Sequence, residues 1–360
     1  MQYEARLKRL QAWLGEQESM YDAILITNPS SIRYLSGFTG TFAFLVINKE
    51  KAFILTDSRY TLQARQQSPH FTLIKLERYT PPTSIAKVCE QEGWSVLGFE
   101  RQDLSFDFYD KLKSFFGRIN LIPVDAAVEQ FRAVKDADEL AILRQAEQIG
   151  SNAFEHILEY IKPGMTEKEV ALELELAMRR QGASGLSFDT IVASGVRSAF
   201  PHGVASDKVI EEGDLVVCDF GCVFEGYCSD MTRTIGIGYL NDSQKDLYHL
   251  VQHAQQSALD AVKAGVIGED MQALVQNIFD EAGFGSYFGH GLGHSVGIDI
   301  HEKPCFSRNV KQAIPAGTAI TVEPGLYVPG IGGVRIEDLI VVTEEGHENF
   351  GTAPKSLIIV

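Results

Sequence analysis

The chain has 360 residues, 45% of them hydrophobic and 22% charged, and a formal net charge of −16 at pH 7. This length allows two domains with substantial cores, and the acidic balance argues against nucleic acid as a partner. No apolar run approaches the roughly 20 residues of a membrane span, which excludes an integral membrane protein. The N-terminus has the pattern of an amphipathic helix with acidic residues rather than a signal peptide, so we expect a cytoplasmic protein.

After this N-terminal helix, the first third of the chain alternates strand-length apolar runs with helix-like stretches. We expect strands at residues 23–27, 43–47, 51–56, 71–76, 96–99 and 121–124. The second and third of these strands are expected to form a hairpin. Helices are expected at 58–67, 83–91 and 106–116. This alternation predicts an α/β domain with a mixed sheet over residues 1–125.

The pattern changes near residues 124–135, so we place a linker at 126–135 and a second domain at 136–360. Asp136 with Glu139, and Thr166 with Glu169, have the spacing of capping boxes and predict the starts of two helices. Further helices are expected at 243–263 and 270–282. Strands are expected at 190–193, 215–220, 231–237, 318–323 and 334–342.

The chain contains five cysteines, an odd number widely scattered, which argues against a disulfide framework. Cys218, Cys222 and Cys228 lie near two acidic candidates, so a thiolate metal site is one interpretation. Their spacing matches no zinc pattern, and a cysteine near a strand is usually a small buried hydrophobic residue. We therefore expect these three to be buried and without metal.

Five residues in short glycine-punctuated segments of the second domain carry the strongest chemical signal. Carboxylates within apolar strands are costly to bury unless a cation neutralises them. Four carboxylates and one imidazole form a hard, oxygen-rich ligand set with more charge than one divalent ion needs. The set predicts two metal ions and a dinuclear metallohydrolase, with the ligands Asp219, Asp230, His294, Glu323 and Glu337.

The turn 224–226 separates the two aspartates, each of which lies at the end of a strand pattern. In an antiparallel hairpin with a loop of even length, such as 224–225 or 225–226, Asp219 and Asp230 lie on the same face. Thr232 and Thr234 would follow on that face as polar neighbours of the ligands. A single aspartate near a strand end is more often a turn residue, but the pair is harder to dismiss.

Histidines in Gly- or Pro-flanked segments add to the site: His202, His290 and His301, besides His294. His290 and His294 have the spacing of a helical zinc pair, but Gly291 and Gly293 favour a strand or loop. Arg335 shares a strand face with Glu337 in the expected strand. It is either a salt-bridge partner of Glu337 or a group that orients this carboxylate or contacts substrate.

These segments, VVCDFG, YCSDMTRT, FGHGLGHSVGIDIHE, ITVEPG and GGVRIEDLIVV in this order, resemble the pita-bread metallopeptidases over essentially the whole chain. The stretches TDSRY (56–60) and SGLSFDTIVASGVRSAFPHG (184–203) are similar to the proline-specific branch, aminopeptidase P and prolidase. The resemblance implies a creatinase-type N-terminal α/β domain and a pita-bread catalytic domain. It also implies substrates that are short proline-containing peptides.

The resemblance assigns a role to each candidate ligand. Asp219 and Asp230 would hold one metal, and Asp230 and Glu337 would bridge to a second metal completed by His294 and Glu323. The family most often uses Mn²⁺, and otherwise Co²⁺ or Zn²⁺. Its members are commonly dimers or tetramers, so we expect a homodimer or higher homo-oligomer. In such oligomers, Arg59 or Tyr60 is a candidate to act in trans.

The family and the residues imply the same hydrolysis, in which a hydroxide between two metals attacks the carbonyl before proline. Glu323 would take up the proton of the water and pass it to the proline nitrogen. His290 or His301 would donate to the developing oxyanion. His202 and Arg335 match further residues of the substrate site. The expected catalytic set is therefore Glu323, His202, His290, His301 and Arg335.

Alternatives differ mainly in the substrate. Methionine aminopeptidases share the five ligands but usually lack a full N-terminal domain, and creatinase lacks the metals. Retention of all five ligands also argues against a noncatalytic pita-bread binding module. Between aminopeptidase P and prolidase no residue decides physically; TDSRY, GASGLSF and the ending APKSLIIV favour an Xaa-Pro aminopeptidase, with Xaa-Pro dipeptidase as the alternative.

Overall fold

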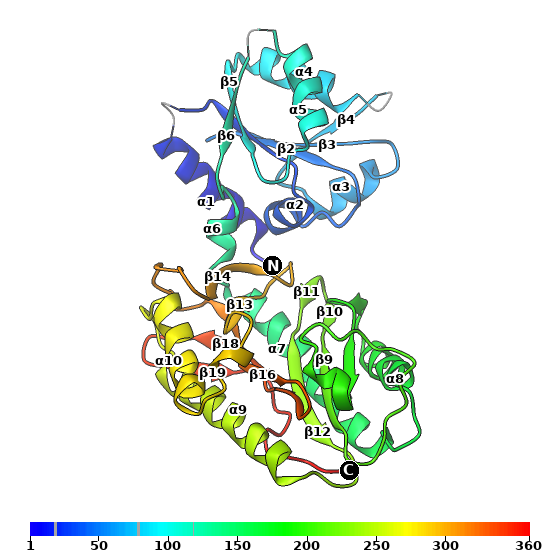
Figure 1. Cartoon of the computed structure of the whole chain (residues 1–360). Helices are drawn as coiled ribbons and strands as arrows, with labels where there is room; N and C mark the ends of the chain where they lie inside the picture. The colour runs from blue at the N-terminus through cyan, green and yellow to red at the C-terminus, as the bar shows by residue number, and fades with distance from the viewer. Residues whose placement is uncertain (18–19, 78–79, 118) are drawn as a thin grey trace. The chain divides into compact units, whose positions relative to one another are not determined.

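The computed structural model describes residues 1–17, 20–77, 80–117 and 119–360, and the chain divides into two compact units, Met1–Arg132 and Ala133–Val360 (Figure 1). The division falls within residues 126–135, the range expected to form a linker. Part of this range is helical, because α6 spans Glu129–Arg132. A linker role for 126–135 stays a prediction.

The first unit is built on one six-stranded mixed sheet with the order β4-β3-β2-β1-β5-β6. Its strands are β1 (Ala23–Ile26), β2 (Phe44–Ile47), β3 (Ala52–Thr56), β4 (Thr72–Lys75), β5 (Val96–Glu100) and β6 (Asn120–Val124). Its other helices are α1 (Tyr3–Glu16), α2 (Pro29–Ser36), α3 (Thr61–Gln67), α4 (Pro81–Glu92) and α5 (Phe106–Phe115). Figure 1 shows α4 and α5 on one side of the sheet and α1 and α2 on the other.

The mixed sheet expected from the sequence is confirmed, including the antiparallel pairing of β2 with β3. The helix α2 is missing from the sequence-based expectations, although the chain carries its signals. The Asn28 side chain accepts a hydrogen bond from the Ser31 N–H at 2.9 Å, Pro29 begins the helix, and Gly37 ends it at φ 75°.

The second unit consists of small antiparallel sheets with helices outside them. The strand orders are β12-β9-β8, β11-β10-β7, β14-β13-β15-β18-β19 and β16-β17. The strands are β7 (Gly185–Leu186), β8 (Ile191–Ser194), β9 (Leu215–Phe220), β10 (Cys222–Phe224), β11 (Tyr227–Cys228), β12 (Met231–Gly236), β13 (Gly293–Ser295), β14 (Glu302–Phe306), β15 (Ala319–Val322), β16 (Gly325–Val328), β17 (Gly332–Arg335), β18 (Asp338–Val342) and β19 (His347–Asn349).

The helices of this unit are α7 (Ala137–Tyr160), α8 (Glu167–Arg180), α9 (Asp242–Ala261) and α10 (Gly268–Glu281), with 3₁₀ turns η1 (Gly195–Ala199) and η2 (Gly285–Tyr287). Both predicted capping boxes are confirmed, at Asp136 for α7 and at Thr166 for α8. Figure 1 shows α8 at one side of the strands and α9 and α10 at the other. Each pair of long helices buries its apolar side chains in its own core cluster, so the strands between them are covered on both sides.

The hairpin that carries the two aspartates has the expected parity. Asp219 of β9 lies opposite Thr232 of β12, and β10 and β11 continue this register to the turn at Glu225 and Gly226. Both turn residues have positive φ, 46° and 77°, as a two-residue hairpin loop requires. Asp230 precedes Thr232 by two residues, so it lies on the same face as Asp219, as a diagonal neighbour.

The single strand expected at 334–342 is wrong. Arg335 ends β17, which pairs only with β16, whereas Asp338 begins β18 in the five-stranded sheet. Ile336 and Glu337 lie between the two strands, where the chain passes from one sheet to the other. Glu337 therefore projects from a junction between two sheets and not from the middle of a strand.

Cys218, Cys222 and Cys228 are all buried and pack in hydrophobic clusters, as expected for structural cysteines. Burial raises the pKa of the Cys218 and Cys228 thiols to about 12, so both carry their proton at neutral pH. Within the described ranges, no helix has the length and apolar character needed to cross a membrane.

Candidate metal centre and active-site cavity

The proposed ligands come together where two antiparallel strand pairs meet. In the pair β15–β18, Val322 lies opposite Asp338, so the next residues outward, Glu323 and Glu337, continue this register at one end of the sheet. A hydrogen bond of 3.1 Å from the Glu337 N–H to the Thr232 carbonyl joins this end to β12. The two glutamates therefore face the aspartates of the β9–β12 pair.

Three carboxylates form the centre of this junction. Ligand oxygens of Asp219, Asp230 and Glu337 all lie within 4.8 Å of one another, and all three residues are buried. Burial, followed by repulsion from Glu337 and Asp219, raises the pKa of Asp230 well above its ordinary value. Burial and the neighbouring carboxylates raise the pKa of Glu337 in the same way.

His294 of β13 completes the set on the other side. Its Nε2 lies 3.5 Å from Asp230 Oδ2 and 3.4 Å from Glu323 Oε1. Its Nδ1 lies 3.2 Å from the Ser295 carbonyl, which can only accept a hydrogen bond, so Nδ1 carries the ring proton. Burial and the adjacent His301 lower the pKa of His294 to about 4, so the imidazole is neutral at pH 7 with the Nε2 lone pair directed at the carboxylates.

The residues present fit a divalent cation. Asp219 Oδ1 is buried without a hydrogen-bond partner in the described structure, and a neutral Nε2 facing carboxylate oxygens leaves several acceptors with no donor between them. Carboxylate oxygens with one imidazole are a donor set suited to hard or borderline ions such as Mn²⁺. In their ionised form these carboxylates would have no donor for the facing oxygens, and a cation among them would satisfy the acceptors and reverse the pKa increases of the carboxylates.

A group of hydrogen bonds from neighbouring side chains orients two of the carboxylates, Asp219 and Glu337. The Thr232 hydroxyl donates to Glu337 Oε2 at 2.6 Å and accepts from Arg335 Nε at 3.0 Å. Arg335 Nη2 donates to Asp219 Oδ2, and Arg335 Nη1 donates to the Tyr327 hydroxyl at 2.5 Å. Arg335 therefore orients the carboxylate of Asp219. Its ion pair among the described residues is with Asp219 and not with Glu337, the partner considered from the sequence.

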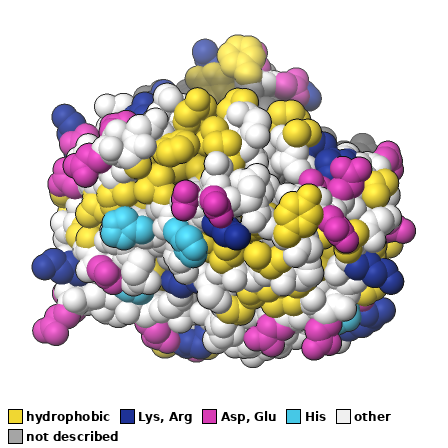
Figure 2. Space-filling view, turned by 60° about the horizontal axis from the view of Figure 1, so that its bottom comes forward, with side chains coloured by type: hydrophobic (Ala, Val, Ile, Leu, Met, Phe, Trp, Pro, Cys, Tyr) yellow, Lys and Arg dark blue, Asp and Glu magenta, His cyan; other side chains and the backbone are white. Residues whose placement is uncertain are grey.

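All the sequence-predicted site residues line one cavity of about 510 Å³: Asp219, Asp230, His294, Glu323, Glu337, His202, His290, His301 and Arg335. Phe188, Ile191 and Ile300 add apolar wall. Figure 2 shows one face of the molecule on which histidine side chains lie beside acidic and basic ones, with hydrophobic side chains around them. The residues from separate segments of the second unit thus form one site.

The three histidines without a proposed ligand role differ in their surroundings. The His301 ring packs edge-on against His294, with 4.4 Å between ring centroids. His290 Nε2 lies 2.9 Å from the Tyr327 hydroxyl, and its Nδ1 lies 2.8 Å from the Gly291 carbonyl. Because Tyr327 accepts from Arg335, its own proton points to His290 Nε2. Burial and Arg335 lower the pKa of His290 to about 4, so this histidine is a neutral acceptor at Nε2.

Sequence reasoning missed Tyr327, which connects Arg335 to His290. Burial raises the pKa of Tyr327 to about 12, so its hydroxyl keeps a proton for His290 at neutral pH. It also missed Glu147 of α7, whose carboxylate accepts from the Asp230 N–H at 3.3 Å and whose pKa burial raises to about 8. Tyr327 follows the segment ITVEPG by two residues and Glu147 lies within a long helix, and neither position alone indicates a role in the site.

Arg59 and Tyr60 belong to the first unit. There the Arg59 guanidinium forms an ion pair of 2.7 Å with Asp57, and the Tyr60 hydroxyl lies 2.7 Å from that of Thr41. A role for either residue in a neighbouring subunit stays a prediction.

Comparison with known families agrees with this site. The model of Metallopeptidase family M24 matches residues 141–344, and that of the Creatinase/Prolidase N-terminal domain matches residues 6–134. The chain belongs to metallopeptidase family M24. The predicted family and fold class, a creatinase-type N-terminal α/β domain followed by a pita-bread catalytic domain, are thereby confirmed.

Relatives of this M24 protein carry two kinds of name. The structure of an Xaa-Pro dipeptidase from Bacillus anthracis is 44% identical, with a TM-score of 0.96 over 99% of this chain and 100% of that one. An X-Pro aminopeptidase from Thermotoga maritima is 39% identical, with a TM-score of 0.89 over 96% and 100%. An Xaa-Pro dipeptidase of Pyrococcus horikoshii is 38% identical over 338 residues, 94% of each chain.

Proposed function

We propose that this M24 peptidase hydrolyses the peptide bond between an N-terminal residue and proline, with divalent metal held by Asp219, Asp230, His294, Glu323 and Glu337. The observation that carries the proposal is the convergence of four carboxylates and a neutral imidazole on one cavity, where Arg335, paired with Asp219, is the one arginine or lysine among the described lining residues. The proline-specific names of the similar proteins support the choice of substrate.

Two divalent ions match the four negative charges of the carboxylates. Mn²⁺ is the proposed ion, with Co²⁺ or Zn²⁺ as alternatives, because the family that the sequence resembles most often uses Mn²⁺. Such a pair, when bound, would supply a water that loses a proton near neutral pH and would polarise the scissile carbonyl. Asp230 and Glu337 are the proposed bridging residues, because they are the most deeply buried of the four carboxylates and face both halves of the set.

Glu323 is the proposed proton carrier. Its carboxylate lines the cavity, lies 3.4 Å from His294 Nε2 and accepts a hydrogen bond of 3.2 Å from the Thr321 hydroxyl. A proton must reach the nitrogen of proline before it leaves, because the amide of an Xaa-Pro bond carries no N–H. A carboxylate at the cavity wall beside the proposed metal position is suited to this transfer.

His301 is better suited than His290 to donate to the developing oxyanion. Both ring nitrogens of His290 are engaged, one by the Tyr327 hydroxyl and one by the Gly291 carbonyl. His301 lines the cavity beside His294, and His202 lines the same cavity. The proposed donor is therefore His301, with His202 contacting substrate and His290 orienting the site.

For the length of the peptide, the charge of the cavity favours the aminopeptidase. Of the described residues that line it, Arg335 is the one arginine or lysine, and its guanidinium donates to Asp219, Tyr327, Thr232 and the Pro201 carbonyl. The C-terminal carboxylate of a bound dipeptide would therefore lack a free arginine or lysine beside it. A longer peptide carries an amide at that position and needs none.

The second candidate is an Xaa-Pro dipeptidase, favoured by the names of the relatives from B. anthracis and P. horikoshii. Three peptides separate the two: Ala-Pro, Ala-Pro-amide and Ala-Pro-Gly, each given to Mn²⁺-loaded enzyme, with Ala-Ala-Gly as control. The aminopeptidase cleaves the amide and the tripeptide at least as well as the dipeptide. Cleavage of the dipeptide alone would establish the dipeptidase instead.

A further inference from the structure

One buried carboxylate outside the cavity accepts hydrogen bonds from an unusual number of donors. Glu167 begins α8, and its side chain is fully buried. Its Oε1 accepts from the Ser194 N–H at 2.8 Å and the Ser194 hydroxyl at 2.9 Å. Its Oε2 accepts from the Ser206 N–H at 3.0 Å and the Ser206 hydroxyl at 2.6 Å, and also from the Arg197 guanidinium.

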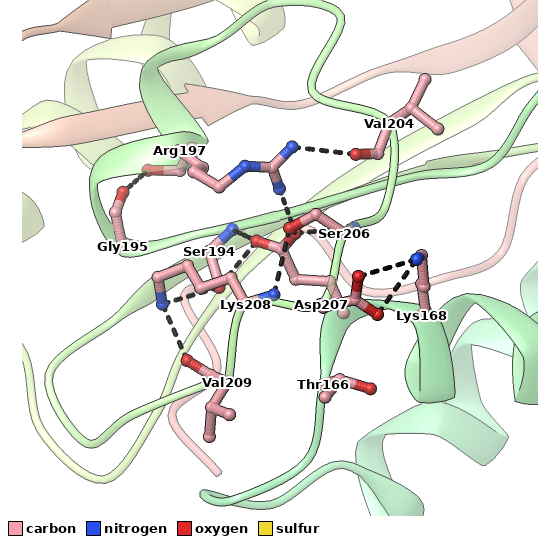
Figure 3. A network of polar contacts seen from close by, with 12 residues as sticks. Thr166, Lys168, Ser194, Gly195, Arg197, Val204, Ser206, Asp207, Lys208 and Val209 are labelled. Atoms are coloured by element: carbon pink, nitrogen blue, oxygen red, sulfur yellow. Dashed lines mark hydrogen bonds and ion pairs between the residues drawn. The ribbon is translucent and has the colours of Figure 1, made fainter.

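These donors bracket one segment of the chain. Figure 3 shows Ser194, Arg197 and Ser206 turned toward this centre, although they span thirteen residues of sequence. Arg197 also donates to the Val204 carbonyl at 2.9 Å, which ties the start of the segment to its end. The first turn of α8 adds a backbone bond, from the Lys168 N–H to the Ser206 carbonyl at 3.1 Å.

The opposite side of the same segment rests on the active-site strands. The Gly333 N–H of β17 donates to the Ser198 hydroxyl at 2.8 Å, and a Cβ at Gly333 would lie only 1.9 Å from the Ser198 carbonyl oxygen. Arg335 Nη1 donates to the Pro201 carbonyl at 3.1 Å. The segment 194–206 is thus fixed between Glu167 on one side and β17 on the other.

This segment carries His202 into the cavity. Unlike His290, the His202 imidazole has no hydrogen bond from any residue that the structure describes. Its position therefore follows from the backbone on which it stands. That backbone is held by the hydrogen bond from the Gly203 N–H to the Phe200 carbonyl. The hydrogen bonds of Arg197 to Glu167 and to the Val204 carbonyl hold it as well.

We propose that Glu167 is a positioning residue for the active site, which holds the segment 194–206 so that His202 faces the cavity. The proposal rests on the proposed function for the role of His202 in substrate contact. Nothing in the fold of α8 itself requires this carboxylate, because Thr166 and Glu169 already cap the helix. The buried charge instead compensates Arg197 and collects the donors of the segment.

Glu167→Gln tests the proposal with little change in volume. A carboxylate accepts at both oxygens, whereas an amide presents an NH₂ group at one of them. Either orientation of the amide places this NH₂ against existing donors, from Ser194 or from Ser206 and Arg197. The variant should loosen the segment without emptying the space that the side chain fills.

The experiment combines two readouts on Glu167→Gln, His202→Ala and the double variant. Hydrogen–deuterium exchange of residues 194–206 reports the segment, and kcat and KM on Ala-Pro-Gly report the site. Lys168→Ala is the matched control, because its exposed ion pair of 2.9 Å joins the same helix to Asp207, the residue directly after the segment. We expect faster exchange in 194–206 for Glu167→Gln and a loss of kcat/KM of roughly tenfold to a hundredfold. Lys168→Ala should match the wild type.

If Glu167 acts through His202, Glu167→Gln has little further effect on kcat in the His202→Ala background. Two results would overturn the proposal. One is hydrogen–deuterium exchange of 194–206 in Glu167→Gln at the wild-type rate. The other is that Glu167→Gln lowers activity in the His202→Ala background as strongly as it does in the wild type. If Glu167→Gln fails to fold, Arg197→Met and Ser206→Ala are measured in the same way. If the wild type cleaves no Xaa-Pro peptide, the proposed function fails, and the exchange data still decide whether Glu167 holds the segment.

Discussion

Asp219 on β9 and Asp230 just before β12 lie on one face of the same antiparallel strand pair, as diagonal neighbours across Thr232. This arrangement brings two carboxylates to a shared position by strand geometry alone. Glu337 joins them from the junction between β17 and β18, within 4.8 Å. Three buried carboxylates so close together repel one another unless a cation lies among them, which gives the site measurable properties.

The variant Asp230→Asn tests the central position. Removal of the charge relieves the repulsion from Glu337 and Asp219, so the chelated variant should melt at or above the temperature of the chelated wild type. Added Mn²⁺ should stabilise the wild type, by about 2.7 kcal/mol at roughly 100 times its Kd, but not the variant. Thermal unfolding with EDTA and with Mn²⁺ measures both effects. Equal stabilisation of the two proteins by Mn²⁺ would show that metal binding does not need the charge of Asp230, and would exclude Asp230 as the bridging carboxylate.

Stability should depend on pH in a direction set by the buried carboxylates. The pKa of Glu323 is raised to about 8, and those of Asp230 and Glu337 lie well above their ordinary values. The folded chelated protein therefore keeps protons that the unfolded chain has lost above about pH 4.5. The unfolding free energy should fall as pH rises toward 8.

His290 and His294, with pKa values near 4, shift the balance at pH values up to about 7.5, because histidines of the unfolded chain still bind protons there. Urea unfolding at pH 7.5 and 8.5 in EDTA therefore reports mainly on the carboxylates. Saturating Mn²⁺ should remove most of this slope, because the cation stabilises the charged forms. A chelated protein that gains stability between these two pH values would contradict the assignment.

Glu323→Gln should separate metal binding from turnover. The amide keeps an oxygen that can ligate, but it cannot hold or release a proton near neutral pH. We expect retained metal and a loss of kcat of about 10² to 10⁴. Metal content and steady-state kinetics on an Xaa-Pro peptide measure the two properties, with the exposed Glu345→Gln as control. Near-wild-type turnover with metal bound would remove Glu323 from the chemistry.

Tyr327→Phe should weaken the site without unfolding it. The hydroxyl joins Arg335 Nη1 at 2.5 Å to His290 Nε2 at 2.9 Å, so its loss frees one nitrogen of each partner. We expect a loss of kcat/KM of roughly tenfold to a hundredfold with nearly unchanged metal content. Tyr239→Phe changes the same group at an exposed position and should have no effect. An equal effect of the two variants would show that Tyr327 has no special role.

Local patterns in the sequence predicted the parts of the site that depend on short segments. The parity of the Asp219–Asp230 hairpin follows from the alternation of a strand, and the capping boxes follow from residue spacing. Glu323 was placed at a strand end because Pro324 follows it, and β15 ends at Val322. These features need no knowledge of distant contacts.

The remaining features depend on contacts between distant segments. Arg233 is fully buried and donates to Asp338 and to the carbonyls of Glu337 and Ala353, yet its sequence position resembles an ordinary strand residue. Tyr327 and Glu167 are similar cases. The break at Glu337 was missed because alternation of apolar and polar residues continues across it, although the chain changes sheets there.

Metal at the five-residue site should drive cleavage before proline. This is measured when Mn²⁺ is titrated into chelated enzyme and cleavage of Ala-Pro-Gly and Ala-Ala-Gly is followed by mass spectrometry. Activity on the proline peptide should rise from zero to a plateau at two ions per chain, with alanine released and the control peptide intact. Full activity in EDTA, or equal cleavage of both peptides, would contradict this expectation.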